Sequence, residues 1–413
     1  MTHHCRHCGT PLEHEVIDLG HQPPSNAYLC EAKLSLPEVT FPLRVYVCSN
    51  CWLVQLPMHA PADALFTADY AYFSSTSITW CQHAERFVNA AVDRLSLGPS
   101  SLVVEVASND GYLLQYVKAQ GIPCLGIEPT HATAEAARSK GIDTHERFFG
   151  GDFAAELVSQ GFRADLLVAN NVLAHVPDIN DFLAAICRVL KPSGVASVEF
   201  PHLLRLLDGN QFDTIYHEHY SYLSLTTLQR MAEDAGLVVI DAEQITTHGG
   251  SLRVWLARSG DSAAAAQTPQ ERHAVEAVLA EESAAGLTTL EAYVRCQERA
   301  LEAKFLLMEY LLAARRSRKR VLAYGAAAKG NTLLNFAGIR SDLLEAVADL
   351  APSKIGKWLP GSHIPIIGVD DLLQRQPDEL LVLPWNLAGE VKAQLRGRID
   401  VPVKVAIPIL SAI

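Results

Sequence analysis

The stretch Leu102-Val103-Val104-Glu105-Val106-Ala107-Ser108-Asn109-Asp110-Gly111 runs from an apolar strand into a turn of small residues and then into a helical pattern. A strand that ends in such a turn lets a cofactor lie against the backbone. The spacing is not G-x-G-x-x-G, which dinucleotide binding requires to seat a pyrophosphate. Acids stand here instead, Glu105 at the strand end and Asp110 in the turn. Negative charge of this kind suits a cationic cofactor that carries no phosphate.

The strands that follow carry polar residues at the same ends. The run 124–128 finishes in Glu128, an acid placed to hold two ribose hydroxyls, although an exposed strand-end acid is an equally ordinary feature. A later run, 165–169, leads into Asn170 and Asn171, where the substrate side of such a site would lie. Because these groups occur in the correct order on successive strands, we expect a methyltransferase that uses S-adenosylmethionine, a sulfonium. The expected cofactor-binding residues are Glu105, Ala107, Asn109, Asp110, Gly111, Glu128, Asn170 and Asn171.

Apolar strand-like runs alternate with helical patterns from about residue 80 to 258, which is typical of an α/β sheet. The runs are Ser101–Val106, Cys124–Glu128, Asp165–Ala169, Val195–Glu199, Leu237–Asp241 and Leu252–Ala257. A linker of small residues follows at 259–266, and the pattern from 269 to 319 predicts one or two long helices. A second α/β unit begins at Val321.

Composition narrows the class of protein. A chain of 413 residues suggests two or three domains, and 49% hydrophobic with 19% charged residues is typical of a soluble protein with several cores. The net charge of −12 argues against nucleic-acid binding, because phosphate contacts need a basic surface, but it leaves room for a small anionic substrate. No apolar run reaches ~18 residues and the first residues lack a signal-peptide pattern, so we expect a cytoplasmic protein without membrane contact.

Two C-x2-C pairs stand near the N-terminus, Cys5 with Cys8 and Cys48 with Cys51. Each pair turns tightly enough to aim both sulfurs at one ion, and two pairs complete a tetrahedral zinc site. A pair of disulfides is the competing interpretation, which a reducing cytoplasm disfavours. Four protein ligands leave no position open for substrate, so we predict a structural zinc ion in a module too poor in apolar residues to fold alone.

Residues 212–222, Phe-Asp-Thr-Ile-Tyr-His-Glu-His-Tyr-Ser-Tyr, hold a dense group of ionisable side chains. We call this segment the box. If it is extended, alternation separates His217 and His219 from Glu218 and the tyrosines. If it is irregular, several of these groups can converge on one substrate atom. Imidazole titrates near neutrality, so we look here for a general base, with a polar loop over the sheet as the alternative interpretation.

In their order along the chain, these segments resemble the sugar C-methyltransferases of deoxysugar biosynthesis, which act on nucleotide-linked 4-keto sugars. The resemblance covers nearly the whole chain. Its motifs are the cysteine quartet, Tyr70-Ala71-Tyr72-Phe73-Ser74-Ser75, EVASNDG at 105–111, NNVLAHVP at 170–177, the box from 216 to 222, HGGSLR at 248–253, GAAAKGN at 325–331 and Pro384-Trp385-Asn386. One departure from the general methyltransferase pattern is Ala107 where glycine is commonest, and an alanine fits there if its φ is negative.

The resemblance implies a zinc module at residues 1–62, a class I methyltransferase domain with a Rossmann-like sheet at 63–258, and a long helix followed by a Rossmann-like α/β domain at 259–413. The last of these would help to enclose the sugar nucleotide, for which a thymidine diphosphate sugar is the expected form. Methylation at C3 of the sugar is expected, with C5 as the alternative. The sequence does not separate a monomer from a homodimer.

Carbon methylation beside a ketone requires a base that removes a proton and a donor that stabilises the enolate oxygen. We expect His219 to be the base, with Glu218 orienting it if the segment is irregular, and His217 to be structural. The candidate partners of the enolate oxygen are Tyr216, Tyr222 and His175, and Tyr70 or Tyr72 is an alternative base or acid. For His175 and Tyr72, packing is the competing interpretation.

The pyrophosphate of such a substrate needs positive charge or backbone donors. Residues 325–331 follow a strand and open a helix, which supplies free N–H groups and a dipole. We therefore expect substrate contacts from Gly325, Lys329 and Asn331, with Arg253 as a second cationic candidate. A solvated helix lysine is the alternative interpretation of Lys329.

Other functions compete with this one. An NAD-dependent oxidoreductase lacks its G-x-G-x-x-G signature, and a zinc-ribbon adaptor with an inactive catalytic unit does not explain the intact acids and the box. Methylation of oxygen or nitrogen needs no enolate and therefore explains the proton-handling cluster less well.

Overall fold

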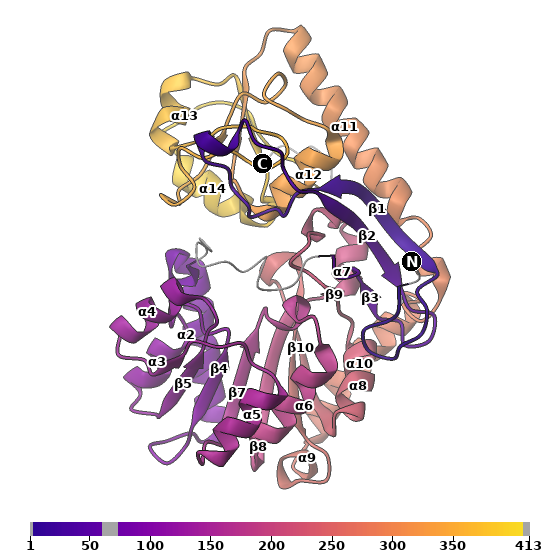
Figure 1. Ribbon diagram of the computed structural model, residues 1–413, viewed down its shortest axis with the longest axis vertical. Helices are drawn as coiled ribbons and strands as arrows, with labels where there is room; N and C mark the ends of the chain where they lie inside the picture. Colours follow the sequence, from indigo (N-terminus) through magenta and orange to yellow (C-terminus); the bar gives the residue numbers. More distant parts are fainter. Residues whose placement is uncertain (1–2, 60–72, 408–413) are drawn as a thin grey trace.

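The computed structural model describes residues 3–59 and 73–407, as two α/β units with the N-terminal strands along one side (Figure 1). The larger unit has a seven-stranded sheet in the order β10-β11-β8-β7-β4-β5-β6. Its strands are β4 (Val103–Val106), β5 (Cys124–Ile127), β6 (Thr144–His145), β7 (Ala164–Asn170), β8 (Leu190–Pro201), β10 (Leu237–Ile245) and β11 (Ser251–Arg258). Strand β11 is antiparallel to β8 and β10, whereas β8, β7, β4, β5 and β6 pair in parallel. All six predicted runs are strands of this Rossmann-like sheet.

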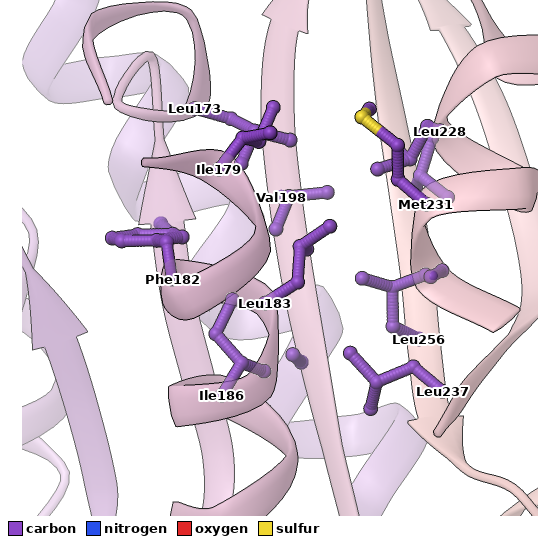
Figure 2. Close-up of a cluster of buried hydrophobic side chains, with 14 of the residues drawn as sticks. Leu173, Ile179, Phe182, Leu183, Ile186, Val198, Leu228, Met231, Leu237 and Leu256 are labelled. Carbon is purple, nitrogen blue, oxygen red and sulfur yellow. The ribbon is translucent and has the colours of Figure 1, made fainter. Parts of the chain in front are cut away.

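Helices cover both faces of this sheet. They are α2 (Ile78–Leu95), α3 (Leu114–Ala119), α4 (His131–Ser139), α5 (Gly151–Ser159), α6 (Ile179–Val189) and α8 (Leu225–Asp234). Helix α7 (Leu203–Asp208) packs instead in the cluster that contains the N-terminal strands. On one face, Leu183 and Ile186 of α6 point toward Val198 of β8, while Met231 of α8 lies near Leu256 of β11 (Figure 2). The other face packs against α2 and α3. Because both faces are covered, the central strands are mostly apolar, which is why the sequence showed them as nearly continuous runs.

A second sheet, in the order β1-β2-β3-β9, belongs to the N-terminal module. Its strands are β1 (His14–Gln22), β2 (Phe41–Val47), β3 (Val54–Gln55) and β9 (Ser221–Tyr222). The last strand comes from the box, where Val54 lies opposite Tyr222 and Gln55 opposite Ser221. The zinc module is therefore hydrogen-bonded to the segment in which we expect the chemistry.

The third sheet is parallel, in the order β14-β13-β12-β15-β16. Its strands are β12 (Val321–Tyr324), β13 (Val347–Ala348), β14 (Ile366–Ile367), β15 (Glu379–Val382) and β16 (Val403–Val405), and its helices are α12 (Ala328–Ala337), α13 (Val369–Arg375) and α14 (Ala388–Leu395). The preceding segment holds α9 (Ser262–Ala265), α10 (Pro269–Ala284) and α11 (Cys296–Arg316). Helix α10 begins at a capping box in which Thr268 and Glu271 satisfy each other's backbone N–H groups.

One hydrophobic cluster joins the three segments. It combines Val45 of β2, Ile215 of the box, Leu307 of α11 and Leu333 of α12. The N-terminal module also reaches the C-terminal unit through an isolated bridge between Leu29 and Trp358. The box is thus packed between all three parts of the chain. Within the described residues, no helix is long and apolar enough to cross a membrane.

Candidate active site

The four paired cysteines converge as their spacing predicts. Their sulfur atoms all lie within 4.8 Å of one another, with 3.5 Å between Cys5 and Cys51 and 3.5 Å between Cys8 and Cys48. Four thiolates gathered in this way are a donor set that zinc binds with tetrahedral geometry.

The turn after β4 has an unusual backbone. Ala107, Asn109 and Gly111 have φ values of 52°, 51° and 74°. Our expectation of a negative φ at Ala107 is wrong, because the chain enters the left-handed region there, at a cost of about 1–2 kcal/mol for a residue with a Cβ. At Gly111, a Cβ would lie 2.4 Å from the Ile142 side chain, so glycine is required both for conformation and for space.

The two acids Glu105 and Asp110, at the end of β4 and in the turn after it, have different surroundings. Glu105 is buried, and burial beside Glu128 and Asp110 raises its pKa well above the ordinary value. One of its carboxylate oxygens has no hydrogen-bond partner among residues 3–59 and 73–407. Asp110 instead accepts from the Ser75 hydroxyl and lies 3.4 Å from the Lys140 ammonium, so its charge is largely satisfied by the protein.

Glu128 closes the turn. Its carboxylate accepts from the backbone N–H groups of Asn109 and Thr130, both at 2.9 Å, and burial raises its pKa. The Asn109 side chain in turn accepts from the N–H of Ser74 at 2.9 Å. Each carboxylate oxygen has a second lone pair, so Glu128 keeps the capacity to accept from hydroxyl groups.

The end of β7 presents amide groups. Asn170 is 7% exposed, and neither polar atom of its side chain has a partner in the described part of the chain. Asn171 has a φ of 55°, and its N–H donates to the Glu199 carbonyl at 2.6 Å. Buried polar atoms are seldom left unpaired, so the Asn170 carboxamide fits a position that a bound ligand completes.

The box is irregular and not extended, which is the conformation that allows several of its side chains to converge. It begins with a 3₁₀ helix, η4 (Phe212–Thr214), and ends in β9. The imidazole of His219 accepts or donates at both nitrogens: Nδ1 lies 2.8 Å from the Thr214 carbonyl, and Nε2 lies 2.8 Å from the Tyr216 hydroxyl. A carbonyl only accepts, so Nδ1 carries a proton, and in the neutral form of the ring Nε2 accepts from the Tyr216 hydroxyl.

His175 lies beside His219. It ends the 3₁₀ helix η3 (Leu173–His175), and the two ring centroids are 4.6 Å apart. Its Nδ1 donates to the Glu218 carbonyl at 2.7 Å, and burial lowers its pKa to about 4. In the neutral ring Nε2 therefore carries no proton. It cannot donate to an enolate oxygen, which removes the role that we expected for His175.

Glu218 turns away from the histidine that it was expected to orient. Both of its oxygens accept from the Asn26 amide, at 2.9 and 2.7 Å, and burial raises its pKa to about 7. The Thr214 carbonyl orients His219 instead. Sequence distance hid the contact, because Asn26 belongs to the N-terminal module.

The remaining aromatic groups of the box differ in their surroundings. Tyr222 is 5% exposed, and its hydroxyl has no partner within residues 3–59 and 73–407. Its ring centroid lies 6.2 Å from that of His219. His217 points to the N-terminal module, where its Nε2 lies 3.3 Å from the Phe41 carbonyl. Tyr70 and Tyr72 lie outside the described residues.

A second polar cluster lies where the C-terminal unit meets the box. The Lys329 ammonium lies over the Trp385 ring, 4.6 Å from its centroid, and 3.2 Å from the Asn386 side-chain oxygen. The Trp385 indole donates to Asp213 at 2.9 Å, and burial raises the pKa of this carboxyl to about 6. The other carboxyl oxygen of Asp213, Oδ1, has no hydrogen-bond partner among the described residues. Asp213 was missed from sequence, although it stands inside the box.

Of the other predicted substrate residues, Gly325 and Asn331 lie in the C-terminal unit with Lys329, and Arg253 lies in the methyltransferase sheet. Gly325 has a φ of 92°, and a Cβ there would lie 2.3 Å from Pro384. Asn331 is 1% exposed, and its carboxamide has no partner within the described ranges. Arg253 instead pairs with Glu199 at 3.1 Å and Glu243 at 3.3 Å in the methyltransferase sheet. We therefore no longer assign Arg253 to the pyrophosphate.

Family models match the chain in the order of its segments. They are described as "Putative zinc binding domain" for residues 5–66, "Methyltransferase domain" for 80–242 and "C-methyltransferase C-terminal domain" for 246–409. The C-methyltransferase NovU of Streptomyces niveus is 34% identical over 387 residues, which cover 94% of this chain and 90% of NovU. The chain belongs to the C-methyltransferase family. The predicted family and fold class of this C-methyltransferase are confirmed.

Other relatives match a part of the C-methyltransferase. A ubiquinone biosynthesis O-methyltransferase of Rhodopseudomonas palustris is 24% identical over 159 residues, which cover 33% of this chain and 63% of the relative. Among solved structures, an S-adenosylmethionine-dependent methyltransferase from Clostridium acetobutylicum has a TM-score of 0.36 at 12% identity, over 43% of this chain and 92% of its own. The CcbJ methyltransferase from Streptomyces caelestis has a TM-score of 0.35 at 15% identity, over 49% and 94%.

Both predicted cofactors of the C-methyltransferase are confirmed. The methyl donor is S-adenosylmethionine, and the four cysteines bind zinc. The residues present fit both groups. Four sulfurs lie together for zinc, and a Glu105 oxygen and the Asn170 carboxamide, both buried and without a partner in the described part of the chain, can bind the cofactor at the sheet edge. Which residues hold each part of the cofactor stays a prediction.

Proposed function

We propose that the enzyme methylates C3 of a nucleotide-linked 4-keto deoxysugar, with a thymidine diphosphate sugar as the expected substrate. The observation that carries this proposal is the pair of imidazoles of the buried His219 and the partly buried His175, whose ring centroids are 4.6 Å apart. Backbone carbonyls accept from Nδ1–H of both rings, so Nε2 is the basic nitrogen of each ring in its neutral form. A basic nitrogen in this position can serve the proton abstraction from carbon that methylation beside a ketone requires.

His219 is the proposed base. A 4-ketone acidifies the hydrogen on the adjacent carbon, because the carbanion is delocalised as an enolate. The Nε2 atom takes this proton through the Tyr216 hydroxyl, which gives its own proton to Nε2 as it receives the one from carbon, while the Thr214 carbonyl at 2.8 Å favours the imidazolium through the Nδ1–H bond. S-adenosylmethionine supplies the electrophilic methyl group that the carbon then receives. Proton transfer by a positioned side chain contributes about 10²- to 10⁴-fold to rate.

Tyrosine hydroxyls are the proposed donors to the enolate oxygen. The buried Tyr222 hydroxyl has its proton to give, and burial raises its pKa, so it stays protonated at neutral pH. Tyr216, whose hydroxyl lies 2.8 Å from His219 Nε2, can relay a proton between the substrate and the base. A buried neutral donor stabilises developing negative charge more than water does.

The start of α12 is the proposed site of the pyrophosphate. Its first turn offers backbone N–H groups and the Lys329 ammonium, and the positive φ of Gly325 brings the chain close to Pro384. Thr332 of α12 donates to the Ile215 carbonyl at 2.9 Å, which links the phosphate end to the box. The nucleotide and the reacting sugar would thus be held by neighbouring elements.

A substrate panel tests the proposal. The enzyme is incubated with S-adenosylmethionine labelled in its methyl group and with nucleotide sugars that carry or lack a 4-ketone. We expect label on carbon, at C3, from 4-keto sugars alone. Label at C5 would correct the position, whereas label on oxygen or nitrogen, or equal transfer to sugars without the ketone, would overturn the proposed function.

A further inference from the structure

Arg6 stands inside the first zinc pair, between Cys5 and Cys8, and its guanidinium contacts residues outside the two zinc pairs. Its Nη1 donates to the Pro177 carbonyl at 2.9 Å, and its Nη2 donates to the Leu56 carbonyl. These two carbonyls belong to different segments. Pro177 follows His175 in the chain, and Leu56 follows β3, which pairs with the strand that carries Tyr222.

Pro177 ends the segment 173–177, which carries His175. The next residue after Arg6, His7, contacts the chain just beyond this segment. His7 accepts from the Asn180 amide through its backbone carbonyl at 2.9 Å, and its Nδ1 lies 2.8 Å from the Asn180 side-chain oxygen. The first zinc pair therefore holds both the end of the His175 segment and the start of α6.

Leu56 is hydrogen-bonded to the box. Its N–H donates to the Tyr220 carbonyl at 3.0 Å, and the Arg6 guanidinium also lies over the Tyr220 ring, 5.3 Å from its centroid. Tyr220 in turn donates to the Ala174 carbonyl at 2.8 Å, beside His175. The contacts form a closed ring: zinc pair, β3, box, His175 segment and back to the zinc pair.

Gln55 fixes Arg6 to the metal site. Its side-chain oxygen accepts from the Arg6 N–H at 2.9 Å, and its amide donates to the Cys5 sulfur at 3.1 Å. Gln55 is buried and pairs with Ser221 of β9. A metal-bound thiolate that accepts this bond would hold Gln55, and through it β9, in one orientation.

We propose that Arg6 is a positioning residue, through which the zinc module sets the distance between the His175 segment and the strand that carries Tyr222. The zinc ion thereby acts on catalytic geometry, beyond its part in folding the module. This inference rests on the proposed function only for the chemistry of the groups that Arg6 positions. The ring of contacts itself is independent of the substrate.

Substitutions at Arg6 separate positioning from folding. Arg6→Met keeps much of the packing on Tyr220 and removes both donors, and Arg6→Lys restores one donor. Arg230→Met is the matched control, because Arg230 donates at 2.8 Å to the Asn50 carbonyl in the second zinc pair from an exposed position on α8, away from the box. Zinc content and the affinity for S-adenosylmethionine, by titration calorimetry, should match the unmodified protein in all three variants.

Amide hydrogen exchange is the decisive readout, because it needs no substrate. In Arg6→Met we expect exchange at residues 173–177 and 220–222 to rise at least tenfold, with β4 unchanged. Turnover on a substrate found in the panel should fall by about 100-fold, since misplacement of catalytic groups by about 1 Å costs that much, and Arg6→Lys should recover part of it. Arg230→Met should change neither quantity.

Several results would overturn the inference. Unchanged exchange at 173–177 and 220–222 in Arg6→Met would show that Arg6 does not hold these segments. Loss of zinc, or faster exchange in β4 as well, would show that Arg6 is needed for folding alone. If no sugar substrate is found but exchange rises locally, the positioning role stands and the proposed function fails.

Discussion

Two backbone carbonyls decide which ring nitrogen carries the proton in His175 and in His219. Thr214 and Glu218 each accept from a histidine Nδ1–H, at 2.8 and 2.7 Å, which leaves both Nε2 atoms as acceptors. A carboxylate in either position would hold the imidazolium more strongly. The carbonyls fix the tautomer and by themselves favour the charged ring, whereas burial opposes the charge at His175 and lowers its pKa to about 4.

The base is tested by His219→Asn. Asparagine is polar and smaller, and it cannot accept the substrate proton, so we expect turnover to fall by about 10²- to 10⁴-fold while the affinity for S-adenosylmethionine stays within about twofold. Steady-state assays and titration calorimetry measure the two quantities. His217→Asn is the matched control, since His217 points to Phe41. Near-normal turnover in His219→Asn would remove His219 from the mechanism.

Glu218 predicts a pH dependence of stability. Its folded pKa is about 7 against an ordinary 4.5, because burial disfavours the carboxylate. The folded state therefore binds one more proton than the unfolded state between these values, and its stability falls by up to about 3 kcal/mol as pH rises from 4.5 to 7. Glu218→Gln removes this term, so the difference in unfolding free energy between variant and parent should shift in favour of the variant from pH 5 to pH 8. Urea unfolding at both pH values measures it, and a constant difference would refute the assignment.

At the scale of elements, α12 brings the phosphate site to the box. Its first turn carries Lys329, and burial lowers the pKa of this ammonium while Asp213 opposes the change. Trp385 and Asn386, from the segment before α14, complete the surroundings. An arriving pyrophosphate would give the buried ammonium a stronger partner than Asn386 supplies.

Lys329→Ala should therefore weaken the binding of a free nucleoside diphosphate by about 10- to 100-fold, the value of one or two charge-assisted hydrogen bonds. Titration calorimetry with the nucleotide alone measures this without any sugar. Lys392→Ala, at an exposed position on α14, is the control and should bind like the parent. Equal affinity in both variants would place the nucleotide elsewhere.

Sequence predicted the long elements and not the short ones. The six strand runs were readable because strands that are covered on both faces are mostly apolar, and the zinc ligands were readable because C-x2-C spacing brings the sulfurs of each pair together. Strand β6, Thr144–His145, is too short to show a pattern. The φ of Ala107 was predicted with the wrong sign, since composition does not report which residues of a turn become left-handed.

Contacts between distant segments were equally hidden. Asn26 meets Glu218, and Arg6 meets Pro177, across the length of the chain. The role expected for Glu218 was wrong for this reason, because its partner lies in another module. Asp213 stood within the box, but its pairing with Trp385 depends on how the C-terminal unit packs.

At the scale of the molecule, the zinc module is part of two cores. Cys5, Cys48 and Leu53 pack into the methyltransferase core, while Val45 and Val54 join the cluster shared with α11 and α12. The module thus supports both α/β units. We expect removal of zinc by a chelator to lower the midpoint of thermal unfolding of the whole protein by at least about 5 °C, since metal binding contributes to folding free energy.

Scanning calorimetry with and without the chelator, with zinc added back as the control, measures this effect. A single transition that shifts as a whole would agree with the shared cores. Loss of a small separate transition, with the main one unmoved, would show that the module folds apart from the rest.

The central claim is that the box abstracts a proton from carbon. The most direct measurement incubates the enzyme with a nucleotide 4-keto sugar in deuterium oxide, without S-adenosylmethionine, and follows C3 and C5 by nuclear magnetic resonance. We predict that the parent enzyme exchanges the C3 hydrogen for deuterium and that His219→Asn does so at least about 100-fold more slowly. No exchange in the parent, or equal exchange in both proteins, would contradict the account.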